Sequence, residues 1–251
     1  MGVTYALDGA VAWLTIDRPE ARNALNQEVR DGLADGMRRF EADPDAAVLV
    51  LTGAGDQAFS AGADLKEMSA TGLGVPPPDF VPLPGTVGLS KPTIAAVNGA
   101  AYAGGFLLAQ SCDLCVAADH ARFAVAEVTV GRGAPWAVPL PWLIAPRVAM
   151  EILLTGDPIG APRAYELGFV NRVVPYGELR GAAQELGERI AANAPLSVAA
   201  ARRTVHLAMA AEHERALGEA YELWAPVYRS DDAQEGPRAF RERRPPRWTG
   251  R

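Results

Sequence analysis

Two glycine-containing junctions in this 251-residue sequence could leave main-chain N–H groups accessible to a ligand. Residues 98–105 (Asn-Gly-Ala-Ala-Tyr-Ala-Gly-Gly) lead from an apolar, β-branched run into an apolar helix, and residues 60–64 (Ser-Ala-Gly-Ala-Asp) follow another apolar strand. The N–H groups at a helix start favour negative charge, and two converging donors would form an oxyanion hole. For either junction alone, the backbone angles of a turn explain the glycines equally well.

A lone carboxylate in an apolar stretch is the second chemical feature. Glu127 is the only acid between Phe123 and Val130. Partial burial of such a group raises its pKa toward neutrality, where it can both accept and donate protons. The residues alone leave open whether Glu127 is such an acid/base or an exposed side chain at a strand edge.

The composition is that of an ordinary soluble globular protein. With 49% hydrophobic and 22% charged residues, the chain can form one large domain, or a domain with an appendage. The net charge of −6 argues against a nucleic-acid partner. The stretch Pro92–Cys112 is uncharged and as long as a membrane span, but Asn98, Gln110 and several glycines favour a buried strand, loop and helix. We expect no membrane association, and the first residues lack a signal-peptide pattern.

The two cysteines, Cys112 and Cys115, have the C-x-x-C spacing of redox and zinc sites. No second Cys/His pair lies nearby, so free buried thiols are the preferred interpretation, and we expect neither a metal nor a redox cofactor. Free thiols are typical of a reducing compartment, which predicts a cytoplasmic protein.

Strand-like and helical runs alternate over the first two-thirds of the chain. Buried strands are predicted at Val11–Ile16, Val48–Thr52, Thr93–Val97 and Leu114–Ala118. A helix capped by Asn26 should bury the face formed by Val29, Leu33, Met37 and Phe40.

Two later regions have different patterns. Residues 72–90 contain five prolines and are predicted to have no regular structure, as a surface loop or as a mobile flap over a pocket. After Gly177, three helices are predicted, with apolar faces at Leu179–Ile190, Val198–Met209 and Ala216–Trp224 and with boundaries at Pro195 and Pro226.

Taken together and in this order, these segments resemble the crotonase (enoyl-CoA hydratase/isomerase) superfamily. The resemblance runs from about Val11 to the C-terminus. Besides the two junctions, its motifs are Ile16–Asn26, Phe123–Gly131, Glu166–Pro175 and Asp231–Phe240. The last of these is similar to carnitinyl-CoA dehydratase-type members.

The resemblance implies an α/β fold, a superhelix of ββα units with a C-terminal helical region for trimerisation. Residues 1–176 would form the core with the CoA and active sites, and residues 177–251 the oligomerisation region of a homotrimer or of a hexamer (a dimer of trimers). It also implies an enzyme that acts on enoyl-CoA thioesters. Coenzyme A would enter as part of the acyl-CoA substrate, with no other cofactor.

By position in the family motifs, Glu127 would be the catalytic acid/base, and the N–H groups of Ala63 and Gly104 would form the oxyanion hole. The residues expected to bind the CoA thioester are Arg22, Asn23, Ala24, Ala61, Asp64, Leu65, Leu107 and Trp136. Arg22 is the expected phosphate contact, with a solvated surface arginine as the alternative.

The sequence departs from two-glutamate hydratases at Leu107, which occupies the position of the family's other glutamate. Hydration is served by two carboxylates, whereas double-bond isomerisation needs one base that moves a proton from the α to the γ carbon. The residues therefore favour isomerisation and the resemblance favours a hydratase, with a non-catalytic or weakly active acyl-CoA-binding homologue as the alternative. If Trp136 and Trp142 line the acyl channel, they predict a short or flat acyl group.

Overall fold

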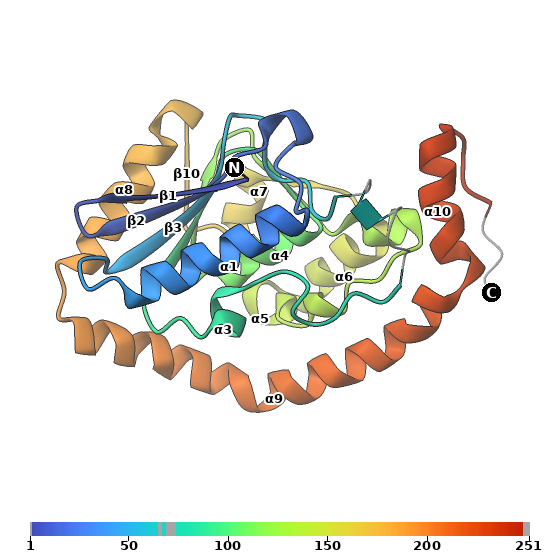
Figure 1. Ribbon diagram of the computed structural model, residues 1–251. Helices are drawn as coiled ribbons and strands as arrows, with labels where there is room; N and C mark the ends of the chain where they lie inside the picture. Colours follow the sequence, from blue (N-terminus) through green and yellow to red (C-terminus); the bar gives the residue numbers. More distant parts are fainter. Residues whose placement is uncertain (1, 65–66, 69–73, 248–251) are drawn as a thin grey trace.

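The strands of this chain form two sheets, and the computed structural model describes residues 2–64, 67–68 and 74–247. The larger sheet consists, side by side in this order, of β1 (Val3–Asp8), β2 (Val11–Ile16), β3 (Val48–Gly53), β5 (Thr93–Val97), β7 (Leu114–Ala118) and β10 (Arg172–Val174). Only β1 runs antiparallel to its neighbour. Figure 1 shows β1, β2 and β3 side by side. The four predicted strands are confirmed as β2, β3, β5 and β7, whose apolar residues are buried as in parallel strands covered on both faces.

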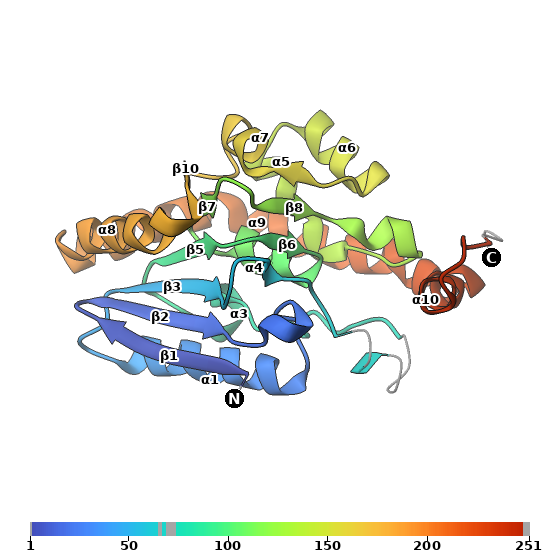
Figure 2. The ribbon, with the colours of Figure 1, turned by 90° about the horizontal axis from the view of Figure 1, so that it is seen from above.

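The smaller sheet consists of β4 (Ala58–Ser60), β6 (Ala100–Tyr102), β8 (Arg122–Ala124) and β9 (Ile159–Gly160), in this order. Along the chain, β4 follows β3, β6 follows β5, and β8 follows β7, so the chain passes repeatedly from the larger sheet to the smaller one (Figure 2). This winding confirms the superhelix of ββα units expected from the sequence. Because β4, β6 and β8 are parallel, the residues that follow Ser60, Tyr102 and Ala124 emerge at one edge of the smaller sheet.

Helix α1 (Gln27–Ala42) forms as its sequence predicts. The Asn26 side chain caps it by accepting a hydrogen bond of 3.0 Å from the N–H of Val29. Its buried face contains Val29, Leu33, Met37 and Phe40. The other helices before residue 192, with η for 3-10 helices, are η1 (Pro19–Ala21), α3 (Pro84–Val87), α4 (Gly104–Ser111), η2 (Ala126–Val130), η3 (Pro135–Ala137), α5 (Leu140–Leu143), α6 (Pro146–Thr155), α7 (Ala161–Glu166), η4 (Tyr176–Glu178) and α8 (Leu179–Ala191).

The C-terminal region corrects one prediction. The two helices expected at Val198–Met209 and Ala216–Trp224 are a single helix, α9 (Pro195–Arg229), which runs along the lower side of the molecule in Figure 1. The linking residues 210–215 (Ala-Ala-Glu-His-Glu-Arg) contain no glycine or proline, so nothing in them interrupts the helix. Pro226 lacks a backbone donor but lies in the last turn, and α9 ends before Ser230, which caps α10 (Asp231–Glu242).

An ion-pair cluster holds α9 against its own chain. The Asp113 carboxylate, between α4 and β7, accepts hydrogen bonds from Arg202 Nε at 2.8 Å and from Thr93 Oγ1 at 2.9 Å. Nε2 of His206 lies 2.9 Å from the same carboxylate. These bonds attach the first half of α9 to its own subunit, whereas the apolar side chains of Leu196 and Val205 on the same helix stay exposed. The assembly into trimers stays a prediction.

The proline-rich segment also differs from expectation in one place. Helix α3 forms within it at Pro84–Val87, although the sequence predicts no regular structure there. Pro84 is compatible with helix because it occupies the first turn, where a backbone N–H has no intrahelical partner.

Asn98 joins the end of β5 to the loop after β3. Its Nδ2 donates to the carbonyls of Gly55 and Ala58 at 2.7 and 3.0 Å, and its Oδ1 accepts from the N–H of Gly53 at 3.1 Å. Because the Asn98 side chain is buried, water cannot reach the buried groups of Gly53 and Ala58 to replace these hydrogen bonds.

We expect Asn98→Ala to lower the free energy of unfolding by about 3 kcal/mol, because buried backbone groups lose their partners. The matched control is Asn193→Ala, since the Asn193 side chain is exposed and, among the described residues, donates to the carbonyl of Arg189 alone. The control should change stability by less than about 0.5 kcal/mol. Urea unfolding of both variants measures the difference, and equal losses would contradict the structural role of Asn98.

Candidate active site

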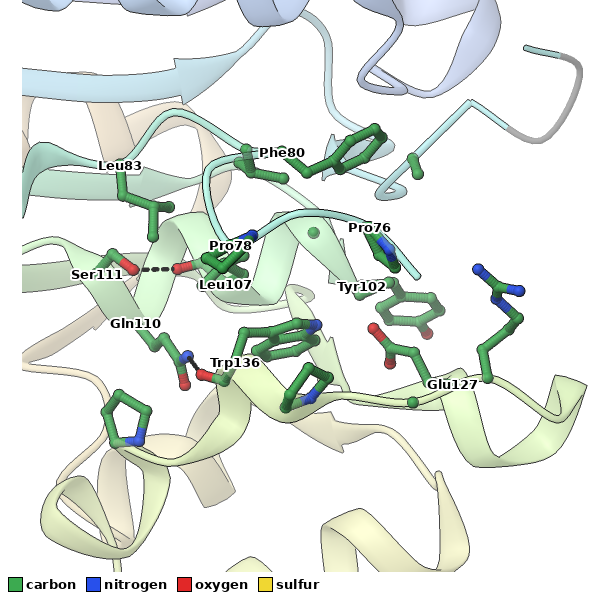
Figure 3. A pocket seen from close by; sticks show the side chains of 18 of the residues that line it. Pro76, Pro78, Phe80, Leu83, Tyr102, Leu107, Gln110, Ser111, Glu127 and Trp136 are labelled. Atoms are coloured by element: carbon green, nitrogen blue, oxygen red, sulfur yellow. Dashed lines mark hydrogen bonds between the residues drawn. The ribbon is translucent and has the colours of Figure 1, made fainter. Parts of the chain in front are cut away.

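A cavity of about 1510 Å³ lies at the edge where β4, β6 and β8 end (Figure 3). Its walls come from α4, η2, the proline-rich segment from residue 76 onward, and α9. Six of the predicted site residues line it, namely Ala61, Ala63, Gly104, Leu107, Glu127 and Trp136. The ends of the parallel strands thus bring together residues that lie more than sixty positions apart in the sequence.

The main chain at Gly62 lies directly against that at Ala103 and Gly104. A Cβ atom added to Gly62 would lie 2.8 Å from Cβ of Ala103, and one added to Gly105 would lie 2.1 Å from the carbonyl oxygen of Ser60. Side chains are therefore excluded at both glycines. Ala103 itself has φ 51° and ψ −118°, a strained conformation for a residue with a side chain.

Two main-chain donors are available at this contact. Gly104 is the first residue of α4, where an N–H group has no intrahelical acceptor. Within the described residues, no hydrogen bond uses the N–H of Gly104 or of Ala63 as its donor. Both groups can therefore bind an oxygen in the cavity, and the oxyanion role assigned to them stays a prediction.

Glu127 projects from η2 into the cavity, as Figure 3 shows. Burial raises the pKa of Glu127 to about 8, against smaller lowering effects of a bond from its own N–H, a hydrogen bond from the Trp136 side chain and the charge of Arg132. Its Oε2 atom is buried and accepts no hydrogen bond. The raised pKa is the behaviour predicted from the apolar stretch around this residue.

Leu107 and Trp136 form the apolar part of the cavity near Glu127. Leu107 lies one turn after Gly104 on α4 and is 8% exposed, at the place where the family's second glutamate is expected. Trp136 lies between Gln110 and Glu127 in Figure 3, and its carbonyl accepts a hydrogen bond of 2.9 Å from Nε2 of Gln110. Trp142 lines the same cavity, so both tryptophans are wall residues.

Of the other predicted CoA contacts, the described residues Arg22, Asn23, Ala24 and Asp64 do not line this cavity. Arg22 and Asn23 line a second, smaller cavity of about 300 Å³. Nδ2 of Asn23 donates to the carbonyls of Ala58 and Ala54 at 2.6 and 3.0 Å, and the residue is fully buried. Its side chain therefore has a structural role, and its N–H donates to the carbonyl of Arg18 at 2.9 Å.

Arg18 binds two of the remaining predicted CoA contacts, Ala24 and Asp64. Its Nη1 donates to the carbonyl of Ala24 at 2.9 Å and to the Asp64 carboxylate at 3.2 Å. Leu65 lies outside the described residues. CoA binding by Arg22, Asn23, Ala24, Ala61, Asp64 and Leu65 stays a prediction.

The cavity residues that the sequence did not reveal include Tyr102, Arg132 and Tyr228. The Arg132 guanidinium is buried, donates to the carbonyl of Gly74 at 2.9 Å and lies 4.4 Å from the ring centroid of Tyr228. The Tyr228 hydroxyl donates to the carbonyl of Gly133 at 2.6 Å. These contacts join α9 to the loop after η2 across 95 residues, which no local pattern reveals.

Helix α10 packs against η2 and also contributes residues to the cavity wall, among them Pro237 and Phe240. A Cβ atom added to Gly236 would lie 2.0 Å from the carbonyl oxygen of Val130, so the two main chains are in contact. The neighbouring Glu235 accepts hydrogen bonds from Arg244 and from the N–H of Arg247, and these bonds lower its pKa to about 2. The turn that carries Glu127 is thus packed against the C-terminal helix.

Within residues 2–64, 67–68 and 74–247, no group of three or more His, Cys, Asp or Glu side chains could hold a metal ion. Cys112 and Cys115 are free thiols, and burial raises the pKa of Cys115 to about 12. No helix of the described chain is long and apolar enough to cross a membrane.

The chain is similar over its length to known CoA-thioester enzymes. Residues 7–251 match a family described as enoyl-CoA hydratase/isomerase. The (E)-benzylidenesuccinyl-CoA hydratase of Thauera aromatica is 38% identical over 259 residues, which cover 100% of both chains. The carnitinyl-CoA dehydratase of Escherichia coli strain K12 is 37% identical, with 97% of each chain covered. The crystal structure of carnitinyl-CoA hydratase from Mycobacterium avium has a TM-score of 0.90 at 38% identity and covers 100% of this chain and 99% of its own.

The pKa of Glu127 predicts how stability changes with pH. Between the ordinary value of 4.5 and about 8, the folded protein holds a proton on Glu127 that the unfolded chain has lost, so stability falls as pH rises through this window. Relative to Glu127→Gln, we expect the wild type to lose about 2 kcal/mol of unfolding free energy between about pH 5 and pH 8, where the full pKa shift sets an upper limit of about 1.4 kcal/mol per pH unit. Urea unfolding at several pH values measures this difference.

The matched control for that experiment is Glu178→Gln, at an exposed glutamate. It should keep the pH dependence of the wild type. If the difference in unfolding free energy between wild type and Glu127→Gln stays constant with pH, folding does not change the pKa of Glu127.

Proposed function

Because the chain belongs to the enoyl-CoA hydratase/isomerase (crotonase) family, we propose that it hydrates an enoyl-CoA thioester, or dehydrates the 3-hydroxyacyl-CoA, through an enolate. Glu127 is the proposed acid/base, and the N–H groups of Ala63 and Gly104 the proposed oxyanion hole. One observation carries the proposal: an isolated carboxyl group of raised pKa lines the same cavity as two main-chain donors without internal acceptors.

The chemistry follows from these groups. In dehydration, ionised Glu127 removes the proton from C2, and the resulting charge moves to the thioester oxygen, where the two N–H groups stabilise it. In hydration, protonated Glu127 returns that proton to C2 after water has added at C3. A pKa of about 8 leaves both protonation states accessible near neutral pH, which suits a group that works in both directions.

Double-bond isomerisation is the second candidate reaction. Leu107 provides no proton carrier where the two-glutamate members have one, and one carboxylate suffices to move a proton between C2 and C4. Hydration is preferred because similar full-length proteins are named hydratases and dehydratases.

The walls of the cavity favour a flat acyl group. Trp136, Phe80 and Leu107 provide apolar surface beside Glu127, and a flat group can stack on the indole. The benzylidenesuccinyl-CoA hydratase of Thauera aromatica acts on an acyl group with an aromatic ring, which is consistent with this assignment.

The nucleotide part of the substrate is assigned to the region around Arg18. In this proposal, Arg22, the main chain of Asn23 and Ala24, and Ala61, Asp64 and Leu65 flank CoA, with Arg22 contacting phosphate. The proposed assembly is a homotrimer or a dimer of trimers in the cytoplasm. The exposed apolar side chains Met150 and Leu154 on α6 and Phe240 on α10 are candidates for contacts between subunits.

We expect Glu127→Gln to lower crotonyl-CoA hydration about 1,000-fold, since general acid–base catalysis is lost while the shape of the side chain is kept. Exchange of the C2 protons of butyryl-CoA in D₂O, followed by NMR, should fall equally because it requires the same base. Glu178→Gln is the matched control and should retain both activities. Leu107→Glu should raise hydration relative to isomerisation of a 3-enoyl-CoA.

The same measurements separate the enzyme from a binding homologue. A wild-type protein that binds butyryl-CoA without exchanging its C2 protons or hydrating any 2-enoyl-CoA would support the non-catalytic alternative. If Glu127→Gln exchanges the C2 protons of butyryl-CoA as fast as the wild type, Glu127 is not the base.

A further inference from the structure

Tyr102 lines the cavity, and its hydroxyl has no hydrogen-bond partner among the described residues. Tyr102 is the last residue of β6 and lines the cavity together with Glu127. Its hydroxyl end points toward the Glu127 carboxyl group in Figure 3. Among the described residues, no hydrogen bond involves this hydroxyl, although the side chain is half-buried. A polar group in this position is available to a ligand.

The backbone fixes the direction of this side chain. Tyr102 pairs with Ala124 of β8, three residues before Glu127, and the N–H of Ala103 donates to the carbonyl of Ala124 at 3.0 Å. On the other side, a Cβ atom added to Gly62 would lie 3.0 Å from the carbonyl oxygen of Tyr102. Tyr102 is therefore held between the segment of Glu127 and the segment of Ala63. The strained residue Ala103 links it to Gly104.

Because Leu107 cannot carry a proton, the proposed reaction needs another polar group near C3 of the substrate. A dehydratase must protonate the hydroxyl that leaves C3, and a hydratase must orient the water that attacks C3. The side chain at position 107 can do neither, and Glu127 is occupied with the C2 proton in the proposed reaction. Of the cavity residues near Glu127, Tyr102 has a neutral O–H that can both donate and accept.

We propose that Tyr102 is a second catalytic residue, which binds the oxygen at C3 and takes the part of the missing carboxylate; this rests on the proposed hydratase function. In dehydration, Glu127 takes the C2 proton and the C3–O bond breaks, while Tyr102 transfers its phenolic proton to the leaving hydroxyl. Water departs, and the proton on Glu127 then returns to the Tyr102 oxygen. Hydration is the same sequence reversed, so no proton or electron pair is gained or lost.

The test is Tyr102→Phe, which removes one oxygen atom and keeps the ring. We expect hydration of crotonyl-CoA to fall about 100-fold, the usual contribution of one general acid or base. Exchange of the C2 protons of butyryl-CoA, and isomerisation of a 3-enoyl-CoA, should stay within about threefold of wild type because neither reaction moves an oxygen at C3. The matched control is Tyr165→Phe, since Tyr165 is exposed on α7 and its hydroxyl makes no hydrogen bond among the described residues.

Two further outcomes decide the proposal. The double variant Tyr102→Phe/Leu107→Glu should recover hydration at least about tenfold over Tyr102→Phe alone, because a carboxylate is restored at position 107. Hydration within about threefold of wild type in Tyr102→Phe, or an equal loss of exchange, isomerisation and hydration, would overturn the catalytic role. A failure of the hydratase function itself is distinguishable, because the wild-type protein would then hydrate nothing.

Discussion

The site depends on a close contact between two main-chain segments, with no space for a side chain between them. Gly105 packs against the carbonyl of Ser60, and Gly62 packs against Ala103. The pairing of β4 with β6 sets this distance, because it aligns Ser60 with Ala101. Any Cβ at Gly62 or Gly105 would separate the segments and move Ala63 away from Gly104. The smaller sheet therefore acts mainly as the support that holds these two segments together.

The second requirement is a carboxyl group that the fold keeps out of water at a cost in stability. Burial disfavours the ionised form of Glu127, and the hydrogen bond from Trp136 and the charge of Arg132 offset only part of this effect. The turn η2 therefore needs support from other elements. Tyr228 of α9 bonds to the loop after η2, and Gly236 of α10 rests on Val130. The C-terminal helices thus complete the active site of their own chain, whatever they contribute to assembly.

Features encoded within a few residues could be predicted from the sequence. Continuous apolar runs marked β2, β3, β5 and β7, the Asn26 cap marked the start of α1, and a single acid in an apolar stretch marked Glu127. Features that depend on distant partners could not be predicted. The contact of Arg132 with Tyr228 is one example, and the continuity of α9 past Pro226 is another. Asn23 is a third, since its motif suggested a ligand contact and the fold uses its side chain to join loops.

The origin of the raised pKa distinguishes this site from one with two carboxylates. In a pair of acids, each negative charge raises the pKa of the other, and the effect persists in water. Here, no acidic side chain of the described residues contributes to the shift, which comes from burial. The proton affinity of Glu127 therefore depends on how completely the cavity excludes water. Leu107, Trp136 and a bound acyl group all exclude water, so substrate binding should itself increase the proton affinity of Glu127. In the proposed acid/base role of Glu127, the apolar wall would therefore be part of the chemistry, because a carboxyl group whose pKa is set by burial responds to whatever occupies the cavity.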